Sequence, residues 1–250
     1  MSYSKYLNDK FLAFAHRGGN DFGPENSLKS FLGAYEIGYK YLETDVHLSK
    51  DGHLVAFHDE SLDRVTNKTG LIKDLKLSDI KKAKIDNSEE IPSLIELLDN
   101  IPNCFFNIDC KSDDTVIPLI EVIKKFSLLD RVCIGSFSQK RINFIRESLG
   151  SKVKTSMGPR EILLAKILSN FPINRFFDSA YASLPIRRYG IELLNKKNIN
   201  FLQKNNQKVI AWTINDESEM RLLIERGVDG IMTDKILLLK KILIEQNKWQ

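Results

Sequence analysis

The feature that most constrains the fold is a regular alternation of short apolar runs with longer amphipathic segments. We predict strands at nine apolar runs, residues 11–15, 41–48, 53–58, 104–109, 131–137, 152–157, 179–184, 208–214 and 230–233. We predict helices over residues 27–39, 92–101, 115–126, 139–149, 159–168, 189–198, 217–227 and 235–247. Strands that alternate with helices of this length form βαβ units and a parallel sheet. Eight or nine such strands favour an α/β fold of the (β/α)₈ type, a TIM barrel, over an open doubly wound sheet.

One departure from the alternation lies early in the chain. The strands at 41–48 and 53–58 are joined by "SKDG", a turn signal, so we expect a hairpin there. The following region, about residues 59–93, contains "NKTG" and many charges and is longer than an ordinary loop. We predict a small insertion after the second barrel strand, covering the mouth of the barrel, within a single domain that spans residues 1–250.

Composition restricts the class of protein. The chain is 42% hydrophobic and 28% charged, with a formal net charge of only +4. That charge is mixed in sign along the chain, so we expect no nucleic-acid partner. Neither a signal peptide nor a run long enough to span a bilayer is found. The three cysteines, Cys104, Cys110 and Cys133, form no CxxC pair and are typical of core residues in a reducing compartment. We therefore expect a cytoplasmic protein without stable membrane insertion.

All four histidines lie in the first quarter of the chain. Catalytic groups of a barrel gather at the C-terminal ends of its strands. His16 and Arg17 stand at such an end after the first strand, and His58 stands at another. Because a histidine titrates near neutral pH, it suits general acid or base catalysis. We predict this role for His16 and His58, and a structural role for His47 and His53.

Acidic residues mark two further strand ends. Residues two apart on a strand share a face, so Glu43 and Asp45 project together, and Asp109 and Lys111 do likewise. Buried carboxylates that lie close together need a positive partner. A divalent cation with oxygen ligands is one solution, and a lysine or arginine partner is the alternative.

Together these side chains fit a phosphodiester. Cations at Arg17 and Lys111, with a metal ion, suit an anionic group whose charge grows during the reaction. One histidine would deprotonate the attacking oxygen, and the other would protonate the leaving oxygen. A Schiff-base role for Lys111 is the weaker alternative, since no phosphate-cradling Gly-rich loop follows in the chain.

The sequence resembles the glycerophosphodiester phosphodiesterase family over almost its whole length. The resemblance rests on "HRGGNDFGPENSLKSFLGAYEIGYKYLETDVHLSKDGHLVAFHDESLDRVTNKTG" (16–70), and more weakly on "FNIDCK" (106–111) and "VIAWTINDESEMRLLIERGVDGIMTD" (209–234). It implies a TIM barrel with an insertion after the second strand. It also implies hydrolysis of small-molecule glycerophosphodiesters to glycerol 3-phosphate and an alcohol.

The resemblance assigns roles to individual residues. It implies an acid/base pair at His16 and His58, phosphate contacts from Arg17 and Lys111, and Ca²⁺ or Mg²⁺ on Glu43, Asp45 and Asp109. The family usually has glutamate at the position of Asp109. The resemblance also implies that Glu25 and Asn26 lie at the rim of the site. Trp212 would line the pocket for the glycerol end, with a role in the barrel core as the alternative.

Two other functions fit the same pattern. The first is a lysophospholipase D, which would need an apolar groove for an acyl chain. The second is a barrel that binds glycerophosphodiesters without turnover. The sequence does not determine which alcohol is released, which metal ion is bound, which histidine is the base, or the oligomeric state. It also leaves open whether the reaction passes through a cyclic phosphate or begins with direct attack by water.

Overall fold

The structure, a computed structural model, describes residues 7–172 and 177–249. Eight parallel strands follow one another in the order β8-β7-β6-β2-β1-β13-β12-β9. An isolated parallel bridge from Ser156 to Tyr181 joins the two ends of this order, so the barrel is nearly closed. The strands are β1 (Leu12–Ala15), β2 (Tyr41–Leu48), β6 (Phe105–Cys110), β7 (Val132–Gly135), β8 (Lys154–Thr155), β9 (Tyr181–Leu184), β12 (Lys208–Ala211) and β13 (Gly230–Thr233). The predicted TIM barrel is confirmed.

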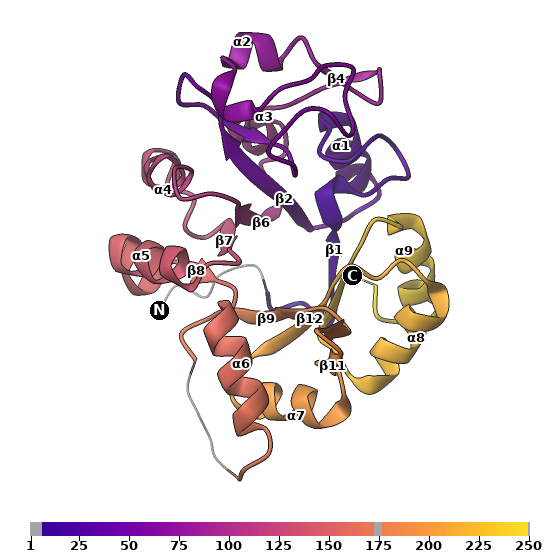
Figure 1. Cartoon of the computed structure of the whole chain (residues 1–250). Helices are drawn as coiled ribbons and strands as arrows, with labels where there is room; N and C mark the ends of the chain where they lie inside the picture. The colour runs from indigo at the N-terminus through magenta and orange to yellow at the C-terminus, as the bar shows by residue number, and fades with distance from the viewer. Residues whose placement is uncertain (1–6, 173–176, 250) are drawn as a thin grey trace.

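Helices surround the barrel, as Figure 1 shows. They are α1 (Leu28–Glu36), α3 (Leu94–Asn100), α4 (Val116–Lys125), α5 (Gln139–Leu149), α6 (Pro159–Leu168), α7 (Lys196–Lys204), α8 (Glu217–Arg226) and α9 (Ile236–Glu245). Polar side chains cap the N-termini of several of these helices. On α1 the Ser27 hydroxyl accepts from the Ser30 N–H, and on α3 Ser93 and Glu96 form a reciprocal cap. No helix in the described part of the chain is long and apolar enough to cross a bilayer.

Apolar side chains form separate cores inside and outside the sheet. The outer core packs the helices onto the strands. The inner core fills the barrel with Leu12, Phe14, Tyr41, Phe105, Cys133, Tyr181, Ile210 and Met232. A barrel filled in this way is a rigid frame, so chemistry is confined to its ends. The three cysteines are free and buried, which confirms their predicted place in the core.

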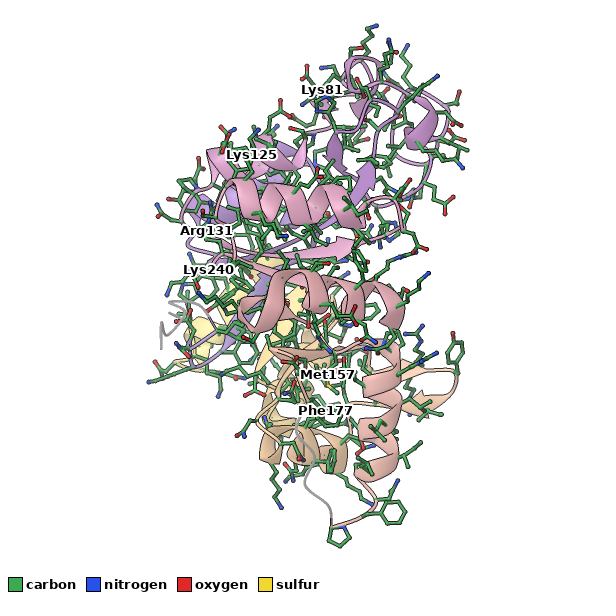
Figure 2. All side chains as sticks on the ribbon, turned by 90° about the vertical axis from the view of Figure 1, so that its left-hand side faces the viewer. Lys81, Lys125, Arg131, Met157, Phe177 and Lys240 are labelled. Carbon is green, nitrogen blue, oxygen red and sulfur yellow. The ribbon has the colours of Figure 1, made fainter. Side chains whose placement is uncertain are left out.

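The segment after β2 has a small core of its own. Strand β3 (Leu54–Ala56) pairs antiparallel with β2, which confirms the hairpin. Beyond it lie α2 (Leu77–Ile80), β4 (Lys84–Ile85) and β5 (Glu89–Glu90), packed around Phe57, Leu62, Ile72, Ile80 and Ile91. This segment projects to one side of the barrel in Figure 1, and Figure 2 shows Lys81 at its outer end.

One predicted helix is wrong. Residues 189–198 do not form a helix from their start; β10 (Arg187–Arg188) and β11 (Ile191–Glu192) make a hairpin instead. Its two turn residues, Tyr189 and Gly190, have φ of 50° and 78°, and a two-residue turn of this kind matches the twist of paired strands. The helix begins only at Lys196, where the Asn195 side chain accepts from the Asn198 N–H.

Candidate active site

The predicted site residues converge at the C-terminal end of the barrel strands. A cavity of about 190 Å³ opens there, which suits a small ligand rather than a macromolecule. Eight of the nine residues predicted for the site line it: His16, Arg17, Glu43, Asp45, His58, Asp109, Lys111 and Trp212. The ninth, Glu25, contacts the site through Arg17, whose Nη1 donates to Glu25 Oε1 over 3.0 Å.

His16 is fixed by an aspartate from the far end of the chain. It directly follows β1, and its Nδ1 donates to Asp234 Oδ1 over 2.7 Å, which leaves Nε2 for proton transfer. Asp234 is held in turn by Asn215, whose Nδ2 donates to Asp234 Oδ2 over 2.7 Å. Burial alone would lower the pKa of His16, but the hydrogen bond to Asp234 and the charge of Glu43 outweigh it and raise the pKa above its usual value.

His58 has a similar partner next to it in sequence. Its Nδ1 donates to Asp59 Oδ1 over 2.6 Å. Asp59 also accepts from Arg64, which reaches across to Glu25 with Nη2–Oε1 of 2.6 Å. Burial opposes ionisation of Asp59, but the hydrogen bonds from Arg64 and His58 lower its pKa to about 2. The aspartate is therefore ionised at neutral pH and orients the imidazole.

The three acids of the site lie on two adjacent strands. Asp45 on β2 and Asp109 on β6 are direct partners in the parallel register. Lys111 Nζ bridges them, at 2.8 Å from Asp45 Oδ1 and 3.0 Å from Asp109 Oδ2. Glu43 lies one inward-facing position before Asp45 and accepts from the Arg17 backbone N–H over 3.1 Å.

Burial and charge act differently on these acids. Burial and the neighbouring charge of Asp45 raise the pKa of Glu43 to about 8. Burial also raises the pKa of Asp109. The pKa of Asp45 is lowered instead, because the charges of Lys111 and Arg17 outweigh the effect of burial. The cluster thus has more acids than its two cations neutralise.

The donor atoms of the three acids are of the type that a hard cation binds. The three acids supply only oxygen, the ligand that Ca²⁺ and Mg²⁺ prefer. Asp45 Oδ2 is buried without a hydrogen bond; Arg17 Nε is 3.4 Å away but not aligned to donate. Within the described residues, no three His, Cys, Asp or Glu side chains are grouped tightly enough to form a metal site. The Lys111 ammonium lies between Asp45 and Asp109.

The remaining predicted residues order the surroundings. Asn26 is buried, and its Oδ1 accepts from the Thr44 hydroxyl over 2.8 Å, which ties the loop after β1 to β2. Trp212 follows β12 and lies edge-on to Phe137, with ring centroids 5.8 Å apart. It lines the cavity and also packs on the inner barrel core, and its role toward the glycerol end stays a prediction. The Nε2–H of His47 donates to the His58 carbonyl over 2.9 Å, in keeping with a structural role.

Sequence reasoning missed the partners of the two histidines. Asp59 was available as the immediate neighbour of His58. Asp234 was available as the first residue after the last strand, the position that singled out His16. The same rule, applied to β7, would have found Ser136 and Phe137, which also line the cavity.

Comparisons with known proteins find relatives over almost the whole chain. The sequence model of the "Glycerophosphoryl diester phosphodiesterase family" matches residues 16–238. The chain is 32% identical over 244 residues to "Probable glycerophosphodiester phosphodiesterase 2" of Mycobacterium tuberculosis, covering 95% of this chain and 92% of that protein.

Two solved structures share the fold. One is a putative glycerophosphoryl diester phosphodiesterase from Silicibacter pomeroyi, with a TM-score of 0.80, 18% identity, and coverage of 97% of this chain and 96% of that one. The other is an Oleispira antarctica phosphodiesterase in complex with the product sn-glycerol-3-phosphate, with a TM-score of 0.76, 24% identity, and coverage of 93% and 96%. At these identities the two structures support the fold alone.

Proposed function

The chain belongs to the glycerophosphoryl diester phosphodiesterase family, and from that membership we propose that it hydrolyses glycerophosphodiesters to glycerol 3-phosphate and a free alcohol. One observation carries the proposal: two aspartate-held histidines and two cationic side chains line a single cavity at the barrel's C-terminal end. The Mycobacterium tuberculosis relative has that activity in its name, and the Oleispira antarctica structure holds the corresponding product.

The two histidines divide the proton transfers. One accepts a proton from the attacking oxygen, and the other protonates the alcohol oxygen as its bond to phosphorus breaks. Each has its Nδ1 bound to an aspartate, so each presents Nε2 to the substrate. Asp234 and Asp59 stabilise the imidazolium when it forms. The attacking oxygen is either water or a glycerol hydroxyl, and the same two groups serve both routes.

Arg17 and Lys111 bind the phosphate. Both lie beside the acids and both face the cavity. A phosphodiester gains negative charge in the transition state, and cations fixed in advance stabilise that charge without reorganisation. Because each cation is already aligned by a carboxylate, little conformational entropy is lost when substrate binds.

Glu43, Asp45 and Asp109 would hold a divalent cation, Ca²⁺ or Mg²⁺. The support is the buried, unbonded Asp45 Oδ2 and the excess of acids over cations in the cluster. When bound, such an ion supplies a Lewis acid that polarises a phosphoryl or hydroxyl oxygen. Lys111 would remain the cation that binds the phosphate beside these acids.

The decisive assay measures glycerol 3-phosphate release from a panel of glycerophosphodiesters, with and without added Ca²⁺ or Mg²⁺. Release from at least one diester supports the proposal. Release of choline from lysophosphatidylcholine, with no turnover of glycerophosphocholine, would favour a lysophospholipase D instead. Tight binding of all diesters without turnover would make the protein a binding barrel.

A further inference from the structure

The cavity has a charged half and an apolar half. The charged half comes from β1, β2 and β6 and the segment after β3, which carry the histidines, the acids, Arg17 and Lys111. The apolar half comes from β7, β8, β9 and β12, through Phe137, Met157, Leu184 and Trp212. The reacting phosphate belongs to the charged half, so the apolar half, which includes the Trp212 predicted for the glycerol end, receives the two organic parts of a diester.

Arg188 brings a positive charge to the apolar half of the cavity. It lies on β10, in the hairpin that follows β9, and it lines the cavity. Its guanidinium carbon is 5.4 Å from the centre of the Phe137 ring and 5.3 Å from the centre of the Tyr189 ring. These distances are within the range of cation–π contacts. Both rings therefore contact the guanidinium of a residue that lines the cavity.

No acidic side chain in the described part of the chain pairs with the charge of Arg188. Arg17 pairs with Glu25 and Asp45, and Lys111 pairs with Asp45 and Asp109. Among the described residues, no Asp or Glu lies within ion-pair distance of Arg188, whose contacts are the two rings. A guanidinium in cation–π contact with rings makes no hydrogen bond to them, so its N–H groups are available to a carboxylate or a phosphate, whose geometry they match.

We propose, as an extension of the function proposed above, that Arg188 is a specificity-determining residue that binds a negatively charged group on the alcohol half of the substrate. The phosphate already has Arg17 and Lys111 in the charged half. The glycerol half of a glycerophosphodiester has no charge. The alcohol is the part that can bring a second anionic group, and alcohols that carry only an ammonium are disfavoured beside a guanidinium.

Two substrates test this directly. Glycerophosphoserine is glycerophosphoethanolamine with one added carboxylate, so the ratio of their kcat/KM values isolates that group. We expect the wild-type enzyme to favour the serine diester. Arg188→Gln is expected to reduce the ratio about three- to tenfold, mainly through a higher KM for the serine diester, as for a partly exposed charged contact. Arg188→Lys, which keeps the charge but not the planar edge, should give an intermediate ratio.

Arg187→Gln is the matched control. Arg187 is the neighbouring residue of the same hairpin, and its side chain is exposed. This variant removes the same charge from the neighbouring residue, which does not line the cavity, so the serine to ethanolamine ratio should stay at the wild-type value. Circular dichroism and urea unfolding of each variant check that the hairpin changes leave the barrel folded.

Each other outcome has a definite meaning. Equal loss toward both diesters in Arg188→Gln would make Arg188 a phosphate ligand and overturn the proposal. An unchanged serine to ethanolamine ratio in Arg188→Gln would also overturn the proposal. A wild-type enzyme that favours the ethanolamine diester would overturn it without any variant. If the wild type turns over neither diester nor any other member of the panel, the proposed function fails and this proposal fails with it.

Discussion

His16 and Asp234 are 218 positions apart in sequence, yet His16 Nδ1 lies 2.7 Å from Asp234 Oδ1. The register of the sheet explains the contact. Ala15 at the end of β1 and Thr233 at the end of β13 are direct partners in a parallel pair, and His16 and Asp234 are the next residue of each strand. Closure of the barrel therefore brings the first and last strands together and builds one half of the proposed acid/base pair.

Asp234→Asn is expected to lower kcat about 10- to 1000-fold, because an amide no longer fixes the tautomer and orientation of His16. The change also removes a negative charge that raises the pKa of His16. That pKa should fall, so the limb of the pH–rate profile that reports His16 should move to lower pH. The profile of kcat/KM between pH 5 and 9 measures both effects.

Asp99→Asn is the control for this change, since Asp99 is exposed on α3, away from the cavity. Asp99→Asn should leave kcat and the pH–rate profile as in the wild type. A wild-type rate and an unshifted limb in Asp234→Asn would contradict the assigned role of the aspartate.

His16→Ala and His58→Ala are each expected to lower turnover about 10²–10⁴-fold with folding intact, the range for loss of a general acid or base. A glycerophosphodiester of p-nitrophenol separates the two roles. This alcohol leaves without protonation, so the variant that lacks the general acid should regain most of its rate, and the variant that lacks the base should not. Near-normal rates in both variants on ordinary diesters would rule out the two-histidine mechanism.

Much of the barrel could be predicted because hydrophobic periodicity is a local property. The strand-end rule then placed His16, Glu43, Asp45 and Asp109 together without knowledge of the register. The Asp234 contact could not be predicted in this way, since it depends on which strands become neighbours when the sheet closes. The hairpin that carries Arg188 could not be predicted because its apolar spacing matches a helix, and the positive φ of Tyr189 and Gly190 that makes the turn is not visible in that spacing.

Arg64→Gln is expected to make stability less sensitive to acid. Arg64 and His58 hold the pKa of Asp59 at about 2, below its ordinary 3.8. A depressed pKa means that ionised Asp59 stabilises the fold above pH 3.8, and that this contribution is lost as the pH falls toward 2. Since the Arg64 side chain is 48% exposed, the loss of unfolding free energy at neutral pH should be below about 1 kcal/mol.

Urea unfolding at pH 7 and at steps between pH 5 and 2.5 measures the difference. The two proteins should differ most at neutral pH and converge in acid. A difference that is constant across the range would mean that Arg64 stabilises by packing rather than through Asp59.

Removal of divalent ions is expected to abolish hydrolysis, and Ca²⁺ or Mg²⁺ to restore it. Calorimetric titration of the metal-free protein should show one site, and Glu43→Gln and Asp45→Asn should each weaken it, because each removes one of the few charged oxygen ligands. Circular dichroism separates lost binding from lost folding. Full activity after exhaustive chelation would remove the metal from the mechanism.

Asp109→Glu is expected to tighten divalent cation binding several-fold. The extra methylene moves the carboxylate away from the β6 backbone and further into the cavity, where it shares less of its charge with Lys111, now 3.0 Å from Asp109 Oδ2. Room exists for it, because the partner of Asp109 on β7 is Gly135, and a Cβ there would still lie 3.7 Å from Asp109 Oδ1. Gly135→Ala in the same background should reverse part of the gain by narrowing that space. Weaker binding in Asp109→Glu would show that the shorter acid already fits its cation, and that the longer chain only displaces Lys111.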